Sequence, residues 1–235
     1  MVNNKKIEIC IGNVQDIKTL NSYPIDRIEL NSALELGGLS PSLNTLVYAK
    51  SITSIPIVCM VRGRGGDFNY TKEEYDVMYK DAESFLKNGA DGIVFGFLNE
   101  DKSFNEEQMI RFVSLAKKYN KEAVLHKAFD DMTSNIEEDV LKAISFGINR
   151  ILTAGRSVYP NIIEGCKVIN SLNKKYGSQI ELLPGGGIRI DNVKDVYNTC
   201  LTGQAHMTSK KNGINGNICL DEDQLVKIIE KIKEM

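Results

Sequence analysis

Two glutamates, an arginine and two histidines lie in or directly after short apolar segments, and they are the residues best suited to chemistry in this sequence. Glu8 and Glu29 lie within two of these segments, Arg62 and His126 fall near the ends of two others, and His206 lies within the last. Carboxylates and imidazoles act as general acids and bases, and a guanidinium binds carboxylates and phosphates. If the fold gathers these side chains, we expect general acid–base chemistry on a small anionic molecule.

The alternation of side chains predicts where the two glutamates point. Glu8 and Cys10 alternate with isoleucines in the segment 7–11, and Glu29 alternates with apolar residues in the segment 27–31. Successive side chains of a strand point to opposite faces, so the apolar set belongs against helices and the glutamates point inward. A buried charge needs a partner or contact with solvent. Structural ion pairs that only fill the interior are therefore the alternative interpretation of the same residues.

Two glycine-rich stretches predict loops that bind an anion. "LLPGGGI" places three glycines after an apolar run, where their backbone amides can approach a phosphate closely. These glycines are Gly185, Gly186 and Gly187. "CMVRGRGGDF" contains Arg62 and Arg64, which would clamp an anion while the glycines let the loop cover a pocket. A plain tight turn, stiffened by pairing of Arg64 with Asp67, is the alternative.

These residues recur at one position of a repeated unit, in which a strand-like segment is followed by a helical one. The eight strand-like segments are 7–11, 27–31, 57–62, 92–96, 122–127, 150–155, 181–185 and 204–208. Strands that alternate with helices form parallel sheets, so eight units in 235 residues predict one closed (β/α)8 TIM barrel. Since no linker or composition shift divides the chain, we expect a single domain over residues 1–235. In such barrels the chemistry takes place at the carboxyl-terminal ends of the strands.

Capping residues support the helices between these strands. Thr71 with Glu74, and Ser134 with Glu137, have the spacing of a capping box. Other residues of the types that begin helices are Ser40, Asn105 and Asp191. Apolar residues then recur at intervals of three and four, which predicts helices with one buried face.

Charge and cysteine content exclude several classes of protein. With 29 basic and 31 acidic residues, the net charge of −2 argues against a non-specific nucleic-acid binder or a polybasic membrane anchor. The five cysteines form no tight cluster, so we expect reduced thiols rather than a disulfide framework. No apolar run has the length of a bilayer span or of a signal peptide. These features favour a cytoplasmic protein.

Stretches along nearly the whole chain resemble the CutC family in order and spacing. They are "RIELNSALELGGLSPS", "IPIVCMVRGRGGDFNYT", "GADGIVFGFL", "HKAFDD", "RILTAG", "LPGGGI" and "AHMTS". The resemblance implies a cytoplasmic TIM barrel, a homo-oligomer (dimer or tetramer) and a role in copper homeostasis. The family pattern falls on Glu8, Glu29, Arg62, Arg64, Asp67, His126, Asp130, Gly185, Gly186 and His206.

The sequence departs from that family pattern in ways that bear on copper(I) binding. Asn31 stands where family members commonly have a cysteine, while Gly63 and Lys127 replace proline and arginine. Copper(I) prefers thiolate and thioether ligands. Cys10 and His206 are the candidate metal ligands, and two ligands are too few for a tight site. We therefore expect weak copper(I) binding that a Cys10→Ser substitution changes little.

Two functions of different classes follow from the sequence. The resemblance implies a copper homeostasis protein whose partner is a copper ion. The polar residues themselves predict a barrel enzyme acting on a small anionic molecule, for which a phosphorylated compound is one candidate. In the second function, Arg62 and the glycine amides hold the anion, a glutamate serves as base and a histidine as acid. Neither a nucleic acid nor a membrane is an expected partner.

Overall fold

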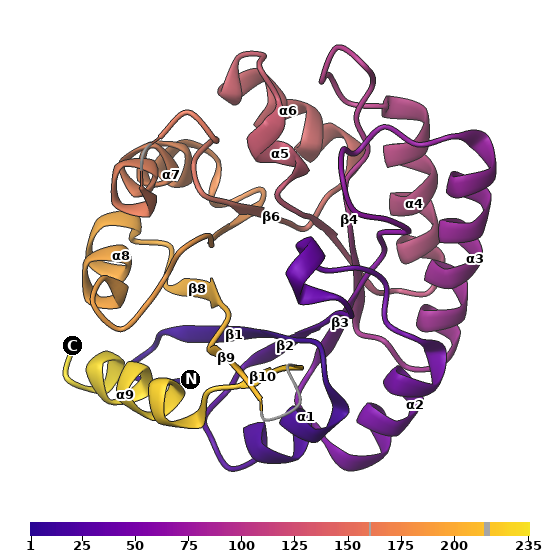
Figure 1. The fold of residues 1–235 in the computed structure, drawn as a ribbon. Helices are drawn as coiled ribbons and strands as arrows, with labels where there is room; N and C mark the ends of the chain where they lie inside the picture. The colour runs from indigo at the N-terminus through magenta and orange to yellow at the C-terminus, as the bar shows by residue number, and fades with distance from the viewer. Residues whose placement is uncertain (160, 214–216) are drawn as a thin grey trace.

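Eight parallel strands form a barrel that helices surround, as the sequence pattern predicts (Figure 1). The computed structural model describes residues 1–159, 161–213 and 217–235. In order along the chain, the elements are β1 (Lys6–Ile11), α1 (Val14–Leu20), β2 (Arg27–Leu30), the 3-10 helix η1 (Leu34–Leu36), α2 (Leu43–Ile52), β3 (Ile57–Met60), α3 (Lys72–Lys87), β4 (Gly92–Phe95), α4 (Glu106–Lys118), β5 (Glu122–Leu125), α5 (Ala128–Asp131), α6 (Ile136–Phe146), β6 (Arg150–Thr153), α7 (Ile162–Tyr176), β7 (Glu181–Pro184), α8 (Val193–Cys200), β8 (Gln204–Met207), β9 (Lys210–Asn212), β10 (Ile218–Leu220) and α9 (Glu222–Lys233). Within the described ranges, no helix has the length and apolar character needed to cross a membrane.

The strands follow one another in spatial order around the barrel, β7-β6-β5-β4-β3-β2-β1-β8. β7 and β8 lie at the two ends of this order and meet where the ring closes. Their contact includes a parallel bridge between Gly185 and His206 and a hydrogen bond of 3.2 Å from the Gln204 amide to the Leu182 carbonyl. A Cβ atom at Gly185 would lie 2.5 Å from a methyl group of Leu152, so a larger residue here would displace that side chain.

The structure confirms the prediction that alternate side chains of the strands face the barrel interior and the surrounding helices. Val58, Met60, Val94 and Val124 form a small apolar cluster of their own inside the barrel. The opposite side chains of the same strands, such as Cys59, belong to the large core between strands and helices. Glu8 and Glu29 lie on the inner set, and both are almost fully buried. The two glutamates therefore point into the barrel.

Several strands end earlier than predicted, although the residues beyond them keep their place at the carboxyl-terminal end. β3 ends at Met60 and β5 at Leu125, so Arg62 and His126 lie in the first turns after these strands. The backbone N–H of His126 still donates to the Phe95 carbonyl at 3.0 Å. This hydrogen bond continues the alternation of the strand by one residue and directs the imidazole inward.

Helix starts follow the predicted chemistry at two positions. Thr71 and Glu74 form the predicted capping box at the start of α3, and Asn105 caps α4. Three other caps were predicted one or two residues too early: Ser134 instead of Asn135, Ser40 instead of Ser42, and Asp191 instead of Asn192. Competing contacts occupy two of these side chains, because Ser134 donates to Asp139 and Ser40 bonds the backbone of Arg62.

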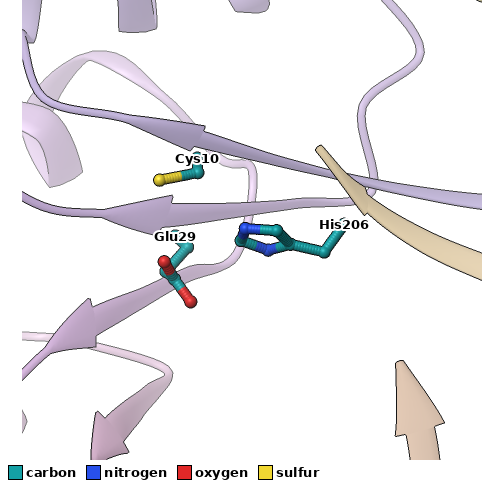
Figure 2. A group of neighbouring side chains, drawn as sticks. All are labelled: Cys10, Glu29 and His206. Atoms are coloured by element: carbon teal, nitrogen blue, oxygen red, sulfur yellow. The ribbon is translucent and has the colours of Figure 1, made fainter. Parts of the chain in front are cut away.

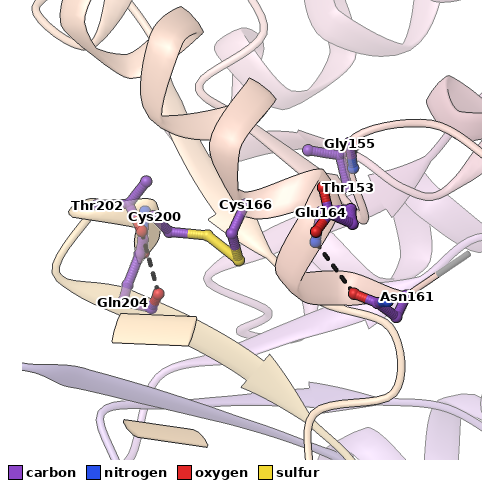
Figure 3. Close-up of a disulfide and its surroundings, with 8 residues drawn as sticks. All are labelled: Thr153, Gly155, Asn161, Glu164, Cys166, Cys200, Thr202 and Gln204. Carbon is purple, nitrogen blue, oxygen red and sulfur yellow. Dashed lines mark hydrogen bonds between the residues drawn. A yellow bond between two sulfur atoms is a disulfide. The ribbon is translucent and has the colours of Figure 1, made fainter. Parts of the chain in front are cut away.

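The prediction of five reduced cysteines is wrong for one pair. Cys166 of α7 and Cys200 at the end of α8 form a disulfide (Figure 3). The two residues are 34 positions apart, about one β/α unit, and α7 packs beside α8. Cysteines at this spacing fall on neighbouring helices of a barrel, and that signal was available in the sequence. Cys10, Cys59 and Cys219 are free thiols.

Candidate functional site

A cavity of about 250 Å³ opens at the carboxyl-terminal mouth of the barrel. It brings together Glu29, Arg62, His126 and His206, four of the five side chains selected first from the sequence. Cys10 and the backbone of Gly186 and Gly187 also line it, whereas Gly185 lies in the closing contact of the barrel. Phe68, from the loop after β3, forms part of the wall, so this loop reaches the pocket as predicted.

Glu8 lies one layer deeper, below the cavity, where it holds His206. The Glu8 carboxylate bonds Nδ1 of His206 at 2.6 Å and forms a buried ion pair with Arg27. Burial alone would raise the pKa of Glu8, but the hydrogen bond to His206 and the charge of Arg27 outweigh it and lower the pKa to about 2. Glu8 is therefore a permanent carboxylate that positions the imidazole.

Cys10, Glu29 and His206 converge above this layer from β1, β2 and β8 (Figure 2). Their donor atoms all lie within 4.8 Å of one another. Nδ1 of His206 is occupied by Glu8, which leaves Nε2 for the cluster. Asn31 orders the other two side chains, because its amide donates to Oε1 of Glu29 at 2.9 Å and to the Cys10 sulfur at 3.3 Å.

Burial and mutual charge decide the protonation of this cluster. Burial and the nearby Glu29 carboxylate raise the pKa of the Cys10 thiol well above its usual value. Burial likewise raises the pKa of Glu29. Burial would lower the pKa of His206, but the carboxylates of Glu29 and Glu8 raise it instead. A cation placed here would therefore displace protons from groups that already lie close together.

Most of the Arg62 guanidinium is used in contacts with the loops at the mouth of the barrel. One terminal nitrogen donates to the Leu36 carbonyl at 3.1 Å, and the other donates to the Gly66 carbonyl at 2.8 Å. The guanidinium also packs against the Phe68 ring, 4.9 Å from its centroid. These contacts tie the loops after β2 and β3 to one side chain, which is 7% exposed.

His126 also packs on Phe68 and is 4% exposed. Its ring centroid lies 4.8 Å from that of Phe68, and Gly96 makes room for it, because a Cβ there would lie 2.7 Å from the imidazole. Burial and the positive charge of Arg62 lower the pKa of His126 to about 3. The imidazole is therefore neutral at physiological pH. His126 does not carry the extra proton that the predicted role of general acid requires.

Positive side chains surround the cavity at its rim. Lys127, Arg189 and Lys210 line it together with Arg62, while Glu29 is the acidic side chain among the lining residues. A Cβ at Gly186 would lie 3.3 Å from Nζ of Lys127, so the lysine extends over the glycine loop. The field at the mouth therefore favours an anion.

Besides Glu8 and Gly185, the family-pattern residues Arg64, Asp67 and Asp130 lie outside the cavity. Arg64 is held by Glu74 at 2.7 Å, by Asp67 at 3.0 Å and by the Asn69 carbonyl, so this side chain stiffens the loop as the alternative interpretation had it. Asp130 accepts hydrogen bonds from Thr153 and from the backbone amides of Ala154 and Arg156. It shapes the loop after β6.

The sequence analysis did not select several further residues of the site. Phe68, Arg189, Lys127 and Lys210 line the cavity, and Asn31 orders the Cys10–Glu29 pair. Asn31 shares the inward parity of Glu29, which was a usable signal. Phe68 and Arg189 lie in loops, where no periodicity indicates the direction of a side chain.

Comparison with known proteins matches most of the chain to one family. The model of the CutC family matches residues 5–211. A CutC family protein of Treponema denticola is 39% identical over 212 residues, which cover 88% of this chain and 82% of that protein. A copper homeostasis protein cutC homolog of Drosophila melanogaster is 36% identical over 194 residues, or 81% of this chain and 72% of that protein.

Solved structures agree on the fold. A CutC crystal structure from Streptococcus agalactiae superposes with a TM-score of 0.80 at 28% identity, covering 86% of this chain and 97% of that one. A phosphoribosyl anthranilate isomerase of Thermococcus kodakaraensis has a TM-score of 0.62 at 16% identity, covering 97% and 98% of the two chains. The second likeness concerns the barrel alone.

Proposed function

Because the chain belongs to the CutC family, we propose that it takes part in copper homeostasis and binds a copper ion through Cys10, Glu29 and His206. The observation that carries the proposal is the convergence of these three donors within 4.8 Å in the barrel mouth. One relative carries copper homeostasis in its name, and copper is here treated as cargo rather than as a resident cofactor.

The donor set suits copper in part. A thiol and an imidazole are ligands that copper accepts well, and the carboxylate of Glu29 adds the third ligand that the sequence pair Cys10–His206 lacked. Oε2 of Glu29 is buried with no hydrogen-bond partner among the described residues, so it is available to an ion. The bond from Glu8 to Nδ1 would orient His206 and raise its basicity toward a metal. With one sulfur ligand, the site favours moderate rather than very tight binding of copper(I).

A titration of copper(I) against a competing chelator tests this function. The sequence pair Cys10–His206 predicted little effect of Cys10→Ser, but with Glu29 as a third donor we now expect this variant to weaken binding, because it replaces the soft ligand with a hard hydroxyl that copper(I) tolerates poorly. Asn31→Cys adds a second sulfur beside Cys10, since the Asn31 amide already lies 3.3 Å from that sulfur, and should tighten binding. Equal affinities in the wild type and both variants would contradict the proposal.

The charges at the mouth favour a second function, an enzyme acting on a small anionic molecule. Arg62, Lys127, Arg189 and Lys210 line the cavity, and the backbone of Gly186 and Gly187 is exposed to it. In this function Glu29 would act as base and His206, positioned by Glu8, as acid. Because its lowered pKa leaves His126 without an extra proton near neutral pH, the acid is assigned to His206 rather than to His126.

Binding of inorganic phosphate, measured by calorimetry, tests the second function. Arg62→Ala should weaken binding by about 1.5–3 kcal/mol, because it removes a charged hydrogen-bond donor from a partly desolvated site. Arg64→Ala is the matched control, since Arg64 is paired outside the cavity and its loss should leave phosphate affinity unchanged. An equal loss in both variants would contradict the assignment. The cytoplasmic location and the homo-oligomeric state stay predictions from the family resemblance.

A further inference from the structure

Two buried N–H groups line the cavity without an acceptor. Nε of Arg62 and Nε2 of His126 have no hydrogen-bond partner in residues 1–159, 161–213 and 217–235. Both side chains are more than nine-tenths buried, and both line the cavity. Leaving a buried donor unpaired is costly, so these positions call for an acceptor.

The hydrogen bonds of His126 determine which of its nitrogens carries the proton. The backbone N–H of Ala128 donates to Nδ1 at 3.0 Å, so Nδ1 is an acceptor and carries no hydrogen. The neutral ring must therefore carry its proton on Nε2. This nitrogen is a donor fixed in direction by the backbone of the next turn, and it needs no protonation to bind an oxygen.

The same reasoning applies to Arg62. Its terminal nitrogens donate to the carbonyls of Leu36, Gly38 and Gly66, while its Nε hydrogen makes no hydrogen bond among the described residues. The guanidinium and the His126 ring both pack on Phe68, at 4.9 and 4.8 Å, and the positive charge of Arg62 acts on the imidazole. One donor is charged and the other is neutral, and both are rigidly held.

We propose that Nε of Arg62 and Nε2 of His126 form a subsite for one oxyanion group, a phosphate or a carboxylate, of the molecule that enters the mouth. The subsite lies apart from the Cys10–Glu29–His206 cluster in its ligands and uses donors only. It rests on the second proposed function, and it replaces the predicted acid role of His126 with that of a hydrogen-bond donor. Donors fixed before the ligand arrives are those that best stabilise charge on an oxygen.

The chain has only two histidines, which makes the subsite directly observable. In protein labelled with ¹⁵N-histidine, the His126→Gln variant assigns the two imidazoles in long-range ¹H–¹⁵N spectra. In the protein without an added anion, we expect His126 to show an unprotonated Nδ1 and a protonated Nε2. Inorganic phosphate, and acetate in a separate titration, should shift the Nε2 signal, while sodium chloride at equal ionic strength should not.

Two variants separate the hydrogen bond from the packing of the ring. His126→Gln keeps an N–H near the position of Nε2, whereas His126→Leu removes it at similar size. The leucine variant should bind phosphate about tenfold more weakly than the glutamine variant, as expected for a hydrogen bond to a charged group. Equal binding by the two would overturn the subsite.

The outcomes distinguish the subsite from the function on which it rests. A shift with either probe supports the subsite, and the probe that causes it identifies the group as phosphate or carboxylate. Phosphate binding in calorimetry without a shift of His126 would overturn the subsite and leave the anion pocket standing. Absence of binding by both probes would overturn the anion pocket together with its subsite.

Discussion

The buried neutral imidazole of His126 should make stability depend on pH in a way that one substitution removes. Burial and Arg62 lower its pKa from the ordinary 6.5 to about 3 in the folded chain. Between these values the unfolded chain binds a proton that the folded chain refuses, so stability falls as the pH falls through this window. Above the window both states are neutral, and the contribution vanishes.

The size of the effect follows from the two pKa values. Between about pH 7 and about pH 5, one group with these values costs about 2 kcal/mol of unfolding free energy. This figure depends mainly on the unfolded value, because the folded value lies well below pH 5.

Urea unfolding at both pH values measures this cost. His126→Gln removes the titrating group and keeps an N–H, so the variant should lose about 2 kcal/mol less than the wild type between the two pH values. The titrations of Glu29 and His206 are common to both proteins and cancel in the difference. Parallel losses in wild type and variant would refute the neutral, buried state of His126.

Three further predictions concern the framework of the barrel. Reduction of the Cys166–Cys200 disulfide opens a loop of 34 residues and should lower the free energy of unfolding by about 3–4 kcal/mol, measured with and without reductant, while a Cys200→Ser variant should show no response to reductant. Glu8→Gln removes the carboxylate that holds His206, so the pKa of His206 should fall in an NMR titration; an unchanged value would refute the positioning role of Glu8. Asp139→Ala leaves the buried guanidinium of Arg156 without its carboxylate and should cost about 3–5 kcal/mol in denaturant unfolding, whereas breaking the exposed pair with Lys194 by Glu234→Ala should leave the stability nearly unchanged, because solvent screens it.

Alternation and repetition in the sequence were sufficient to predict the barrel and its inward glutamates. The first two strands show a period of two and the capped helices a period near 3.6, so the strand parity and the end of the barrel that carries the site follow locally. Glu8 and Glu29 were placed by this rule, and their neighbours of opposite parity lie in the outer core. The motifs that resemble the CutC family are also patterns of residues close in sequence, because each lies at one strand end and its loop.

Contacts between distant segments decided what each polar residue does. Glu8 and Glu29 have the same residue type and parity, yet Glu8 lies below the cavity beside Arg27 and His206, while Glu29 lines it. Their pKa values shift in opposite directions for that reason.

The chain by itself thus determined the strands, their inward faces and the polar residues at the mouth, because those depend on neighbours close in sequence. Tertiary structure alone decided that Arg64 also pairs with Glu74 of α3 and that His126 is neutral. The spacing of Cys166 and Cys200, about one β/α unit, indicated neighbouring helices, but the packing of α7 beside α8 brings the two sulfurs together. Burial, charge and the direction of a loop side chain depend on what packs against a residue. For Arg64 and His126 the neighbours that matter are a helix residue and a guanidinium from another strand end, and no local pattern of the sequence indicates that they will be in contact.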